Sequence, residues 1–505
     1  MTASKSVSTS PWNGFDAWAR RLMCDWDVPG LCLAVLHRDE VVLCKGYGFR
    51  NVKKRLPVDP DTIFPICSLT KAFTSALLGM LVDEGRLEWD RPLRAYLPDF
   101  QLKDPVATER MTPRDLLCHR CGLPRHEMFW YSDLWHRREL YQRLRYLDPF
   151  ADFRAVYQYN NLMYMVAGLL IEELAGKTWE EFVTERLFTP LGMTGTTVDI
   201  AAARRDPNLV VPYMLYRGSL RAVPIVSIDS IGPAGSINSS LRDMLAWARL
   251  HLAHGRHDGR ELISRACLEE TYRPQTVAPI PNPTTEIPYS TYALGWSVAP
   301  YRGVRRLAHS GGIDGISTRM GMLPDHDLAV LVFTNQGGSP LPIILELGIY
   351  DRFLGLSPID WSARQKANRQ SAEAKGAQAR RRWASERKKG TRPSHPLADY
   401  AGDYEHPGYG KISFGVEKGR LVCTFGQFSA PMSHYHYDTF KWEIRLWDTE
   451  FWYADWRMTF GADVSGEIAS VSVPFEPMTP PIVFTRPTGR RGPVFSTRDG
   501  LPFAR

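Results

Sequence analysis

A serine and a lysine, Ser68 and Lys71, stand three residues apart at the start of an apolar stretch with helical periodicity. Positions i and i+3 share a helix face, so the lysine amine can reach the serine hydroxyl. A serine is a weak nucleophile until a base takes its proton, and a lysine desolvated by burial can be that base. The N–H groups of a helix N-terminus can also hold an oxyanion. This spacing is common in ordinary helices, so the hypothesis of nucleophilic catalysis needs further residues.

Two other segments could complete such a site. Tyr159-Asn160-Asn161 opens a second apolar stretch, where the phenol could exchange protons with the nucleophile and an amide could position a carbonyl or hold Lys71. The alternative is a helix cap with a buried tyrosine. His309-Ser310-Gly311-Gly312 precedes a strand-like run, and its glycines could let a substrate lie close to a strand edge. The alternative here is a glycine-rich loop.

Together, in this order and spacing, the three segments resemble the serine β-lactamase and penicillin-binding-protein superfamily. Its class C-like branch of esterases and D-aminopeptidases is the most similar. The motifs S-x-x-K, Y-x-N and [KH]-[ST]-G match 68–71, 159–161 and 309–311. The flanking runs 111–117, 122–124 and 191–193 resemble the same family, and the resemblance covers about residues 12–355.

The resemblance implies a mechanism without cofactor or metal. Ser68 would attack a carbonyl, with Lys71 and Tyr159 sharing the general-base role and either one open as the dominant base. The backbone N–H groups of Ser68 and Gly312 would form the oxyanion hole. The remaining motif residues would bind and orient the substrate and leaving group: Asn161, His309, Ser310 and Gly311.

Two residues depart from the family pattern. Asn160 stands where serine or alanine is usual, and His309 stands where true β-lactamases and transpeptidases carry lysine. Histidine is typical of the esterase and peptidase relatives. We therefore expect a serine hydrolase that cleaves esters or small amides and peptides, including peptides with D-amino acids. The alternatives are an acyltransferase or peptide cyclase that uses the same acyl-enzyme, and a catalytically idle binding scaffold.

Other hydrolase classes lack their signatures in this sequence. No G-x-S-x-G run occurs, which argues against an α/β-hydrolase, and no H-E-x-x-H run occurs, which argues against a metal hydrolase. The aromatic clusters 129–131 and 451–453 could line an apolar cleft or be core residues. The pair Cys118 and Cys121 has no second C-x-x-C partner, so we interpret these thiols as structural.

The elements that must position the motifs form an α+β pattern, with strands at both ends enclosing a helical middle. We expect an antiparallel sheet that distant segments complete, with flanking helices and a helical subdomain, as in the β-lactamase/transpeptidase fold. A capping box at Ser240 and Asp243 should open a helix through Leu252. The other expected elements are a hairpin over 31–47, helices over 70–84, 160–174 and 341–354, and strands over 294–299, 318–323 and 328–334.

The catalytic domain should end near residue 355, before a basic linker over 356–395. Residues 361–390 hold ten Lys or Arg against two Glu, a net +8, while the whole chain is +7. The rest therefore sums to −1, so the charge belongs to one stretch and not to a folded face, which favours a solvated, partly helical linker; the alternative is a strip that contacts RNA or a membrane. Residues 396–488 are rich in aromatics in short alternating runs, which predict a small antiparallel barrel. The run 397–404 resembles the lipocalin-like barrel of some related peptidases.

Composition places these domains in an ordinary globular protein of 505 residues, with 44% apolar and 23% charged residues. No apolar window reaches the roughly 20 residues of a membrane span. Residues 1–12 are polar and lack the apolar stretch of a signal peptide, so we expect a cytoplasmic protein with reduced cysteines. The expected partner is a small ester, amide or short peptide, with no nucleic acid and no membrane. A homo-oligomer is left open.

Overall fold

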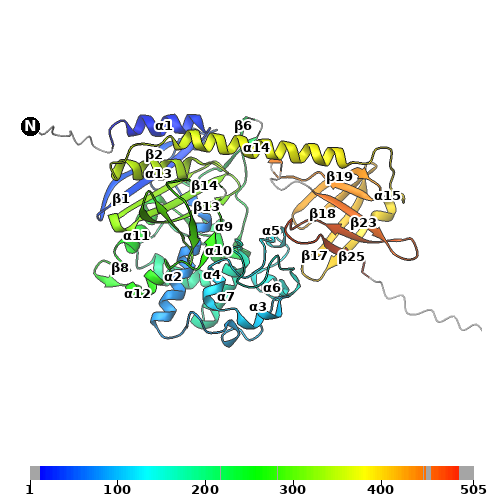
Figure 1. Ribbon diagram of the computed structural model, residues 1–505, viewed down its shortest axis with the longest axis horizontal. Helices are drawn as coiled ribbons and strands as arrows, with labels where there is room; N and C mark the ends of the chain where they lie inside the picture. The colour runs from blue at the N-terminus through cyan, green and yellow to red at the C-terminus, as the bar shows by residue number, and fades with distance from the viewer. Residues whose placement is uncertain (1–11, 217, 281, 447–448, 451–455, 488–505) are drawn as a thin grey trace, which may run out of the picture. The chain divides into compact units, whose positions relative to one another are not determined.

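A computed structural model describes residues 12–216, 218–280, 282–446, 449–450 and 456–487. The chain forms two units, drawn in chain colours in Figure 1. One unit runs to Glu386 and includes residues 445–450, and the other holds residues 387–444 and those from 451 onward. Within the described ranges, every helix is too short or too polar to cross a membrane. The boundaries expected at 355 and 396 remain predictions.

The first unit is built on an antiparallel sheet in which, among the described residues, nine strands follow the order β10-β11-β12-β13-β14-β15-β1-β2-β3. β1 pairs with β15, with Ala34 opposite Leu331. The expected completion of the sheet by distant segments is therefore confirmed. In chain order the strands are β1 (Gly30–His37), β2 (Glu40–Asn51), β3 (Leu56–Pro57), β10 (Thr276–Ala278), β11 (Ser290–Tyr292), β12 (Ser297–Tyr301), β13 (Val304–Ile313), β14 (Ile316–Leu323) and β15 (Leu328–Thr334).

Helices cover both faces of this sheet. α1 (Phe15–Asp25) and α13 (Leu341–Phe353) pack on one face and share an apolar core with β1 and β15. α11 (Leu241–Leu252) packs against the same two strands from the other face. Because neither face is solvated, β1 is buried along nearly its whole length, and its sequence shows a continuous apolar run instead of alternation.

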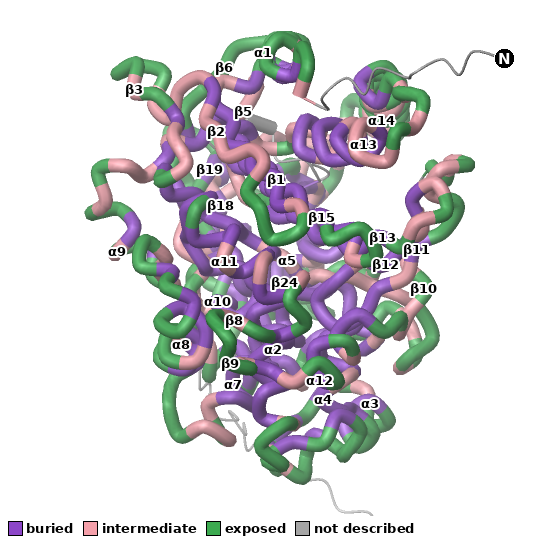
Figure 2. Tube along the Cα trace, turned by 90° about the vertical axis from the view of Figure 1, so that its left-hand side faces the viewer, coloured by how far each residue is buried: buried purple, intermediate pink, exposed green. Residues whose placement is uncertain are grey.

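The helical region centres on α2 (Thr70–Asp83) and α7 (Leu162–Ala175), which are buried on nearly all sides (Figure 2). The short helix α10 (Gly232–Gly235) packs against both. Gly168 of α7 makes this close approach possible, because a Cβ there would lie 2.2 Å from Pro233 Cγ. α10 therefore lies close enough to α2 to place the Ala234 carbonyl beside Lys71.

An ionic network lies buried beside β13 and β14. Glu346 of α13 accepts hydrogen bonds from Arg306 at 2.9 and 3.1 Å, from Tyr350 at 3.0 Å, and from Arg319. Gly321 makes room for it, since a Cβ there would lie 1.9 Å from Glu346 Oε1. The two guanidiniums hold the pKa of Glu346 at about 2 against the effect of burial.

Three expectations about local structure need correction. His309 to Gly312 were expected just before a strand, with a glycine-rich loop as the alternative, but they lie inside β13, where both glycines pair with β14. The strand expected over 294–299 is β12, which begins three residues later and ends two residues later. Ser240 caps α11, but the expected capping box is half formed, because the Asp243 carboxylate accepts from Gly195 N and Thr196 Oγ1.

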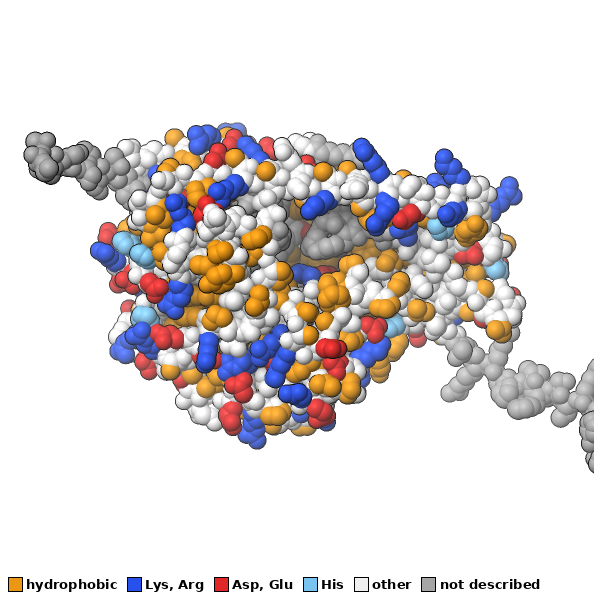
Figure 3. All heavy atoms as spheres, in the orientation of Figure 1, with side chains coloured by type: hydrophobic (Ala, Val, Ile, Leu, Met, Phe, Trp, Pro, Cys, Tyr) orange, Lys and Arg blue, Asp and Glu red, His pale blue; other side chains and the backbone are white. Residues whose placement is uncertain are grey.

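The basic segment contains one helix, α14 (Trp361–Glu386). Its first turns are tied to the first unit by Trp361 Nε1, which donates to Asp351 at 3.3 Å, and by an ion pair between Arg364 and Glu286 at 2.8 Å. The rest is largely exposed, and Figure 3 shows Lys and Arg side chains along the edge where α14 runs.

The second unit is a closed antiparallel barrel, as expected. β16 closes it by pairing with β25 through Glu405 and Thr485. Aromatic rings fill the interior, with Phe460 contacting the rings of Tyr404 and Phe414. Its described strands are β16 (Gly402–His406), β17 (Gly410–Glu417), β18 (Arg420–Phe425), β19 (Phe428–His436), β20 (Thr439–Trp442), β23 (Arg457–Ala462), β24 (Ile468–Val473) and β25 (Ile482–Thr485).

Candidate active site

Ser68 lies in a single turn, η1 (Cys67–Leu69), that leads directly into α2. Cys67 has a φ of 52°, in the left-handed region that a side chain other than glycine rarely adopts. Such strain persists where the surrounding structure fixes it, and it often marks functional sites. Cys67 and Leu69 are buried, whereas Ser68 is partly exposed. The turn therefore presents the Ser68 hydroxyl at a surface while its neighbours anchor it.

Two of the expected residues contact this hydroxyl, and a third contacts one of them. Lys71 Nζ lies 3.1 Å from Ser68 Oγ, and Tyr159 Oη lies 2.9 Å from it. Lys71 also lies 2.8 Å from Asn161 Oδ1 and 2.8 Å from the Ala234 carbonyl oxygen. The structure thus brings together groups that stand far apart in the sequence.

Burial controls the protonation of both candidate bases. Lys71 is completely buried, which holds its pKa well below the usual range, and the charge of Arg125 lowers it further. Burial raises the pKa of Tyr159 to about 12. These directions favour a neutral amine and a neutral phenol at neutral pH.

The third motif lies against the Ser68 turn. Gly311 faces it, and a Cβ there would lie 2.2 Å from both Ile66 O and Thr318 Oγ1. Thr318 also donates to Ile66 O at 3.0 Å. Only glycine allows β13 this close, and the residues on either side, Ser310 and Gly312, are exposed.

His309 is buried and contacts Tyr292, a residue that the sequence analysis did not identify. Its Nδ1 donates to the Ser310 carbonyl at 2.7 Å, so its Nε2 accepts from Tyr292 Oη at 2.8 Å. Burial lowers the pKa of His309 to about 3. The imidazole is therefore neutral at neutral pH.

His119 is a second missed residue, and it holds the segment that carries Tyr159. Its carbonyl accepts from Gln158 N at 2.7 Å, and its Nδ1 accepts from Asn160 N at 3.1 Å. Its ring centre lies 4.2 Å from that of Tyr159. The backbone on both sides of Tyr159 is thus bound to one buried histidine.

Asn160, which departs from the family pattern, has a structural role. Its Oδ1 accepts from Met163 N at 3.1 Å in the first turn of α7, and its Nδ2 donates to the Pro124 carbonyl. It therefore joins the start of α7 to the loop after Gly122. Cys118 and Cys121 are free thiols whose burial raises their pKa to about 12.

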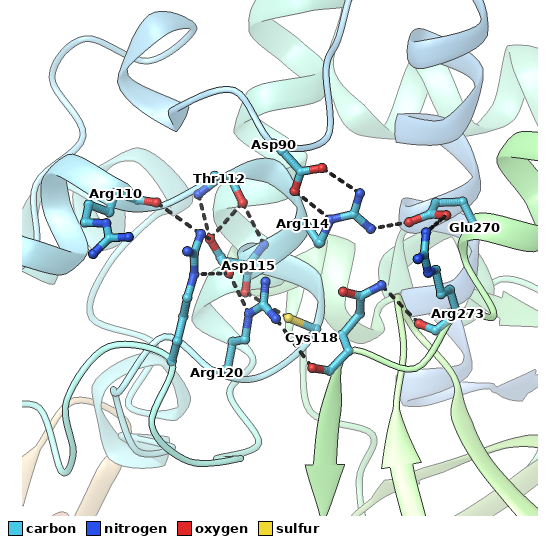
Figure 4. Close-up of polar contacts among 11 residues, drawn as sticks. Asp90, Arg110, Thr112, Arg114, Asp115, Cys118, Arg120, Glu270 and Arg273 are labelled. Atoms are coloured by element: carbon cyan, nitrogen blue, oxygen red, sulfur yellow. Dashed lines mark hydrogen bonds and ion pairs between the residues drawn. The ribbon is translucent and has the colours of Figure 1, made fainter.

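A buried carboxylate anchors the loop that carries His119 (Figure 4). Asp115 of α4 (Pro113–Leu117) is completely buried and bonds to Arg120 at 2.6 Å and Arg154 at 2.6 Å. It also completes a capping box with Thr112. A separate pair, Arg114 with Asp90, lies beside it at 2.7 Å. The flanking run that resembled the family therefore stabilises the loop that positions Tyr159.

The two aromatic clusters have different outcomes. Phe129, Trp130 and Tyr131 form most of α5 (Glu127–Tyr131) and are all buried, which fits core residues. Tyr131 nevertheless donates to Asp314, which follows β13. The cluster at 451–453 lies outside the described residues.

Comparison with known proteins gives a family for most of the chain. The sequence matches the family described as Beta-lactamase over residues 15–345. Residues 386–486 match the family described as Domain of unknown function (DUF3471).

Curated relatives cover much of the same length. "Unguisins hydrolase ungD'" of Aspergillus campestris (strain IBT 28561) is 32% identical over 406 residues, which is 77% of this chain and 74% of that protein. "D-aminopeptidase" of Brucella anthropi is 28% identical, over 66% of this chain and 61% of that protein.

Solved structures share the fold. The octameric penicillin-binding protein homologue from Pyrococcus abyssi matches with a TM-score of 0.60 and 20% identity, over 94% of this chain and 99% of that one. The D-amino acid amidase from Ochrobactrum anthropi SV3 matches with a TM-score of 0.54 and 22% identity, over 67% of this chain and 98% of that one.

Proposed function

The chain belongs to the beta-lactamase family and is a serine hydrolase, and we propose that it forms an acyl-enzyme on Ser68. The observation that carries this proposal is the pair of contacts at Ser68 Oγ, 3.1 Å to Lys71 Nζ and 2.9 Å to Tyr159 Oη. One of these groups can take a proton at that oxygen and the other can give one.

Lys71 is the general base in this proposal. A neutral amine has two N–H groups and one lone pair. The two N–H groups fit the oxygens of Asn161 and Ala234, which leaves the lone pair for the Ser68 proton. The lowered pKa of Lys71 supports this state, and a pKa of about 12 keeps the proton on Tyr159.

The steps follow from these positions. Ser68 Oγ attacks the substrate carbonyl carbon while its proton passes to Lys71. The resulting oxyanion lies between the backbone N–H groups of Ser68 and Gly312. When the bond to the leaving group breaks, that group takes the phenolic proton of Tyr159, and the proton held by Lys71 restores the phenol. Water then attacks the acyl-enzyme with the same groups acting in reverse.

We propose that the substrates are amides of small molecules and short peptides, including peptides with D-residues. One relative is named as a D-aminopeptidase, and a peptidase cleaves amide bonds, which favours amides over esters. The neutral His309 offers no positive charge to a substrate carboxylate, which favours an uncharged acyl group. Transfer of the acyl group to an amine in place of water would give the alternative acyltransferase activity.

The test uses chromogenic substrates and one substitution. Wild type should hydrolyse D- or L-aminoacyl p-nitroanilides, and Ser68→Ala should lose turnover by about 10³-fold or more because no acyl-enzyme can form. Intact-protein mass spectrometry should detect the acyl group on wild type only. Circular dichroism checks that the variant folds. Turnover by a folded Ser68→Ala variant at the wild-type rate would rule out this mechanism, and a product heavier than the acid would indicate acyl transfer.

A further inference from the structure

Two charged side chains that the mechanism does not use lie beside the site. Arg125 Cζ lies 4.9 Å from the ring centre of Tyr159, and Arg125 Nε donates to Glu127 Oε1 at 2.7 Å. We propose that this ion pair sets the charge balance of the site, with Arg125 favouring the neutral form of Lys71 and Glu127 opposing it. The inference rests on the proposed function, because it concerns the protonation of the general base.

The main chain fixes Arg125 in this position. The residue before it, Pro124, accepts a hydrogen bond from Asn160, which follows Tyr159 in sequence. The residue after it, His126, is buried and its Nε2 lies 3.0 Å from the Asp148 carbonyl oxygen. Glu127 then begins α5. Both ends of this short segment are therefore anchored, and the guanidinium stays over the Tyr159 ring.

The geometry makes the ammonium form of Lys71 unfavourable. Lys71 Nζ also lies 4.9 Å from the Tyr159 ring centre, so the two cationic groups approach the same ring. Like charges repel, and the repulsion acts on a completely buried amine, although the Arg125 side chain is itself 33% exposed and partly screened by solvent. In agreement, Arg125 is the largest cause after burial that lowers the pKa of Lys71, and Glu127 raises it.

Among the described residues, the phenols, thiol and imidazoles close to Lys71 favour their neutral forms. The rings of Tyr159 and Tyr164 lie about its amine, at 4.9 and 5.1 Å, and burial raises the pKa of both phenols. Burial also raises the pKa of the Cys67 thiol to about 12. Burial lowers the pKa of the two nearby imidazoles, His119 and His309. The Asp314 carboxylate also raises the pKa of Cys67, and it accepts a hydrogen bond from the Tyr131 hydroxyl.

The same pair acts on Tyr159 in the same direction. Arg125 lowers the pKa of this phenol and Glu127 raises it, although burial dominates. Loss of Arg125 should therefore make either candidate base harder to deprotonate, and loss of the Glu127 charge should make it easier. The direction of the effect does not depend on which residue is the dominant base.

The experiment measures how fast a fluorophosphonate probe labels Ser68 in the full chain between pH 4 and 9. Ser68 Oγ displaces fluoride from phosphorus and its proton passes to the base, so the acid limb of the profile reports the base. Arg125→Met should move this limb to higher pH and slow labelling on the limb by on the order of 3- to 10-fold. Glu127→Gln should move it to lower pH and speed labelling there by a similar factor. The double variant should return toward wild type.

Two controls separate charge from structure. Arg125→Lys keeps the charge and should keep the wild-type limb. Arg305→Met removes an exposed arginine of β13 that pairs with Asp325, and it should leave the profile unchanged. Thermal unfolding identifies any variant that fails to fold, and Arg125→Gln then replaces Arg125→Met.

The outcomes distinguish this inference from the proposed function. Opposite shifts in Arg125→Met and Glu127→Gln support the charge-balance role. Shifts in the same direction, or no shift in either folded variant, overturn it. Labelling of Ser68→Ala at the wild-type rate would instead overturn the proposed function itself.

Discussion

At Ser68, reactivity depends on a single amine, that of Lys71, which is completely buried. Its three polar contacts are the oxygens of Ser68, Asn161 and Ala234. Solvent therefore cannot stabilise the ammonium form. An arginine at this position would stay protonated, and its planar fork would not fit these three oxygens.

Substitution of Lys71 tests the assignment of the base. Lys71→Met and Lys71→Arg should both lower the rate of acylation by about 10²-fold or more, because each removes a neutral amine at the same place. Binding of substrate should change little, so the loss should lie in kcat rather than in KM. Stopped-flow measurement of the acylation burst checks this. A burst rate within tenfold of wild type in Lys71→Arg would assign the base to Tyr159.

At the residue scale, the motifs could be predicted because each is local in sequence. Ser68 and Lys71 lie on one helix turn, so their spacing alone implies contact. Tyr292 could not be predicted, because it reaches His309 across the intervening strand β12. Arg125 follows a Gly-Leu-Pro run that the resemblance included, but nothing in that run indicates a guanidinium over Tyr159.

At the scale of elements, the loop that carries Tyr159 depends on a second loop for its shape. His119 accepts hydrogen bonds from the backbone N–H groups of Gln158 and Asn160 and lies against the Tyr159 ring. Asp115 in turn anchors the loop that carries His119 through Arg120 and Arg154. The phenol is therefore positioned through two layers of buried polar contacts.

Two variants of His119 test whether its side-chain contact with Asn160 N positions Tyr159. His119→Ala should lower kcat by on the order of 10- to 100-fold, because the Tyr159 segment loses its anchor. His119→Asn should recover much of this loss, since asparagine tolerates the left-handed backbone (φ 59°) and offers an amide oxygen to Asn160 N. KM should stay near wild type in both. Equal kcat values for His119→Ala and wild type would show that the loop holds Tyr159 without this side chain.

Elements with a clear apolar pattern could be predicted closely from the sequence. Strands that form only because a neighbouring strand pairs with them could not. The strand expected over 328–334 is β15 to the residue, because its whole run is apolar. β13 was missed, because it contains two arginines, a histidine and two glycines that read as a loop. Arg306 is buried only because Glu346 reaches it from α13, and no local pattern shows that partner.

At the scale of the whole molecule, stability depends on buried groups that titrate. Burial lowers the pKa of His251 and of His309 to about 3, and two arginines hold the pKa of Glu346 at about 2. The unfolded chain would bind protons at these groups near their usual pKa values of about 6.5 and 4.5. Unfolding in mild acid therefore takes up protons, and stability falls as the pH falls.

The first unit should accordingly lose stability in two pH windows. Between about pH 6.5 and 3 the two histidines cost stability, on the order of 2 kcal/mol each at pH 5. Below about pH 4.5 the Glu346 network adds to the loss. His251→Gln should reduce the drop in thermal midpoint between pH 7 and 5, and His326→Gln, an exposed site, should not. An unchanged drop in His251→Gln would contradict this origin.

At this scale, the sequence could predict the fold of the second unit but not the surfaces through which the chain assembles. The aromatic alternation of residues 396–488 could predict a barrel, because alternate residues face a single packed interior. The domain boundaries, the homo-oligomer and the cytoplasmic location stay predictions. These properties depend on surface residues and on partners, whereas the periodicity of apolar residues indicates only which residues form the core.

The pairing of β1 with β15 also has a consequence for how the chain is made. β1 leaves the ribosome roughly 300 residues before its partner, so one edge of the β1–β2 hairpin stays open through most of synthesis. An apolar strand with an open edge is a template for aggregation. We therefore expect the nascent chain to need chaperone protection until β15 emerges, and premature termination before residue 328 to yield insoluble fragments.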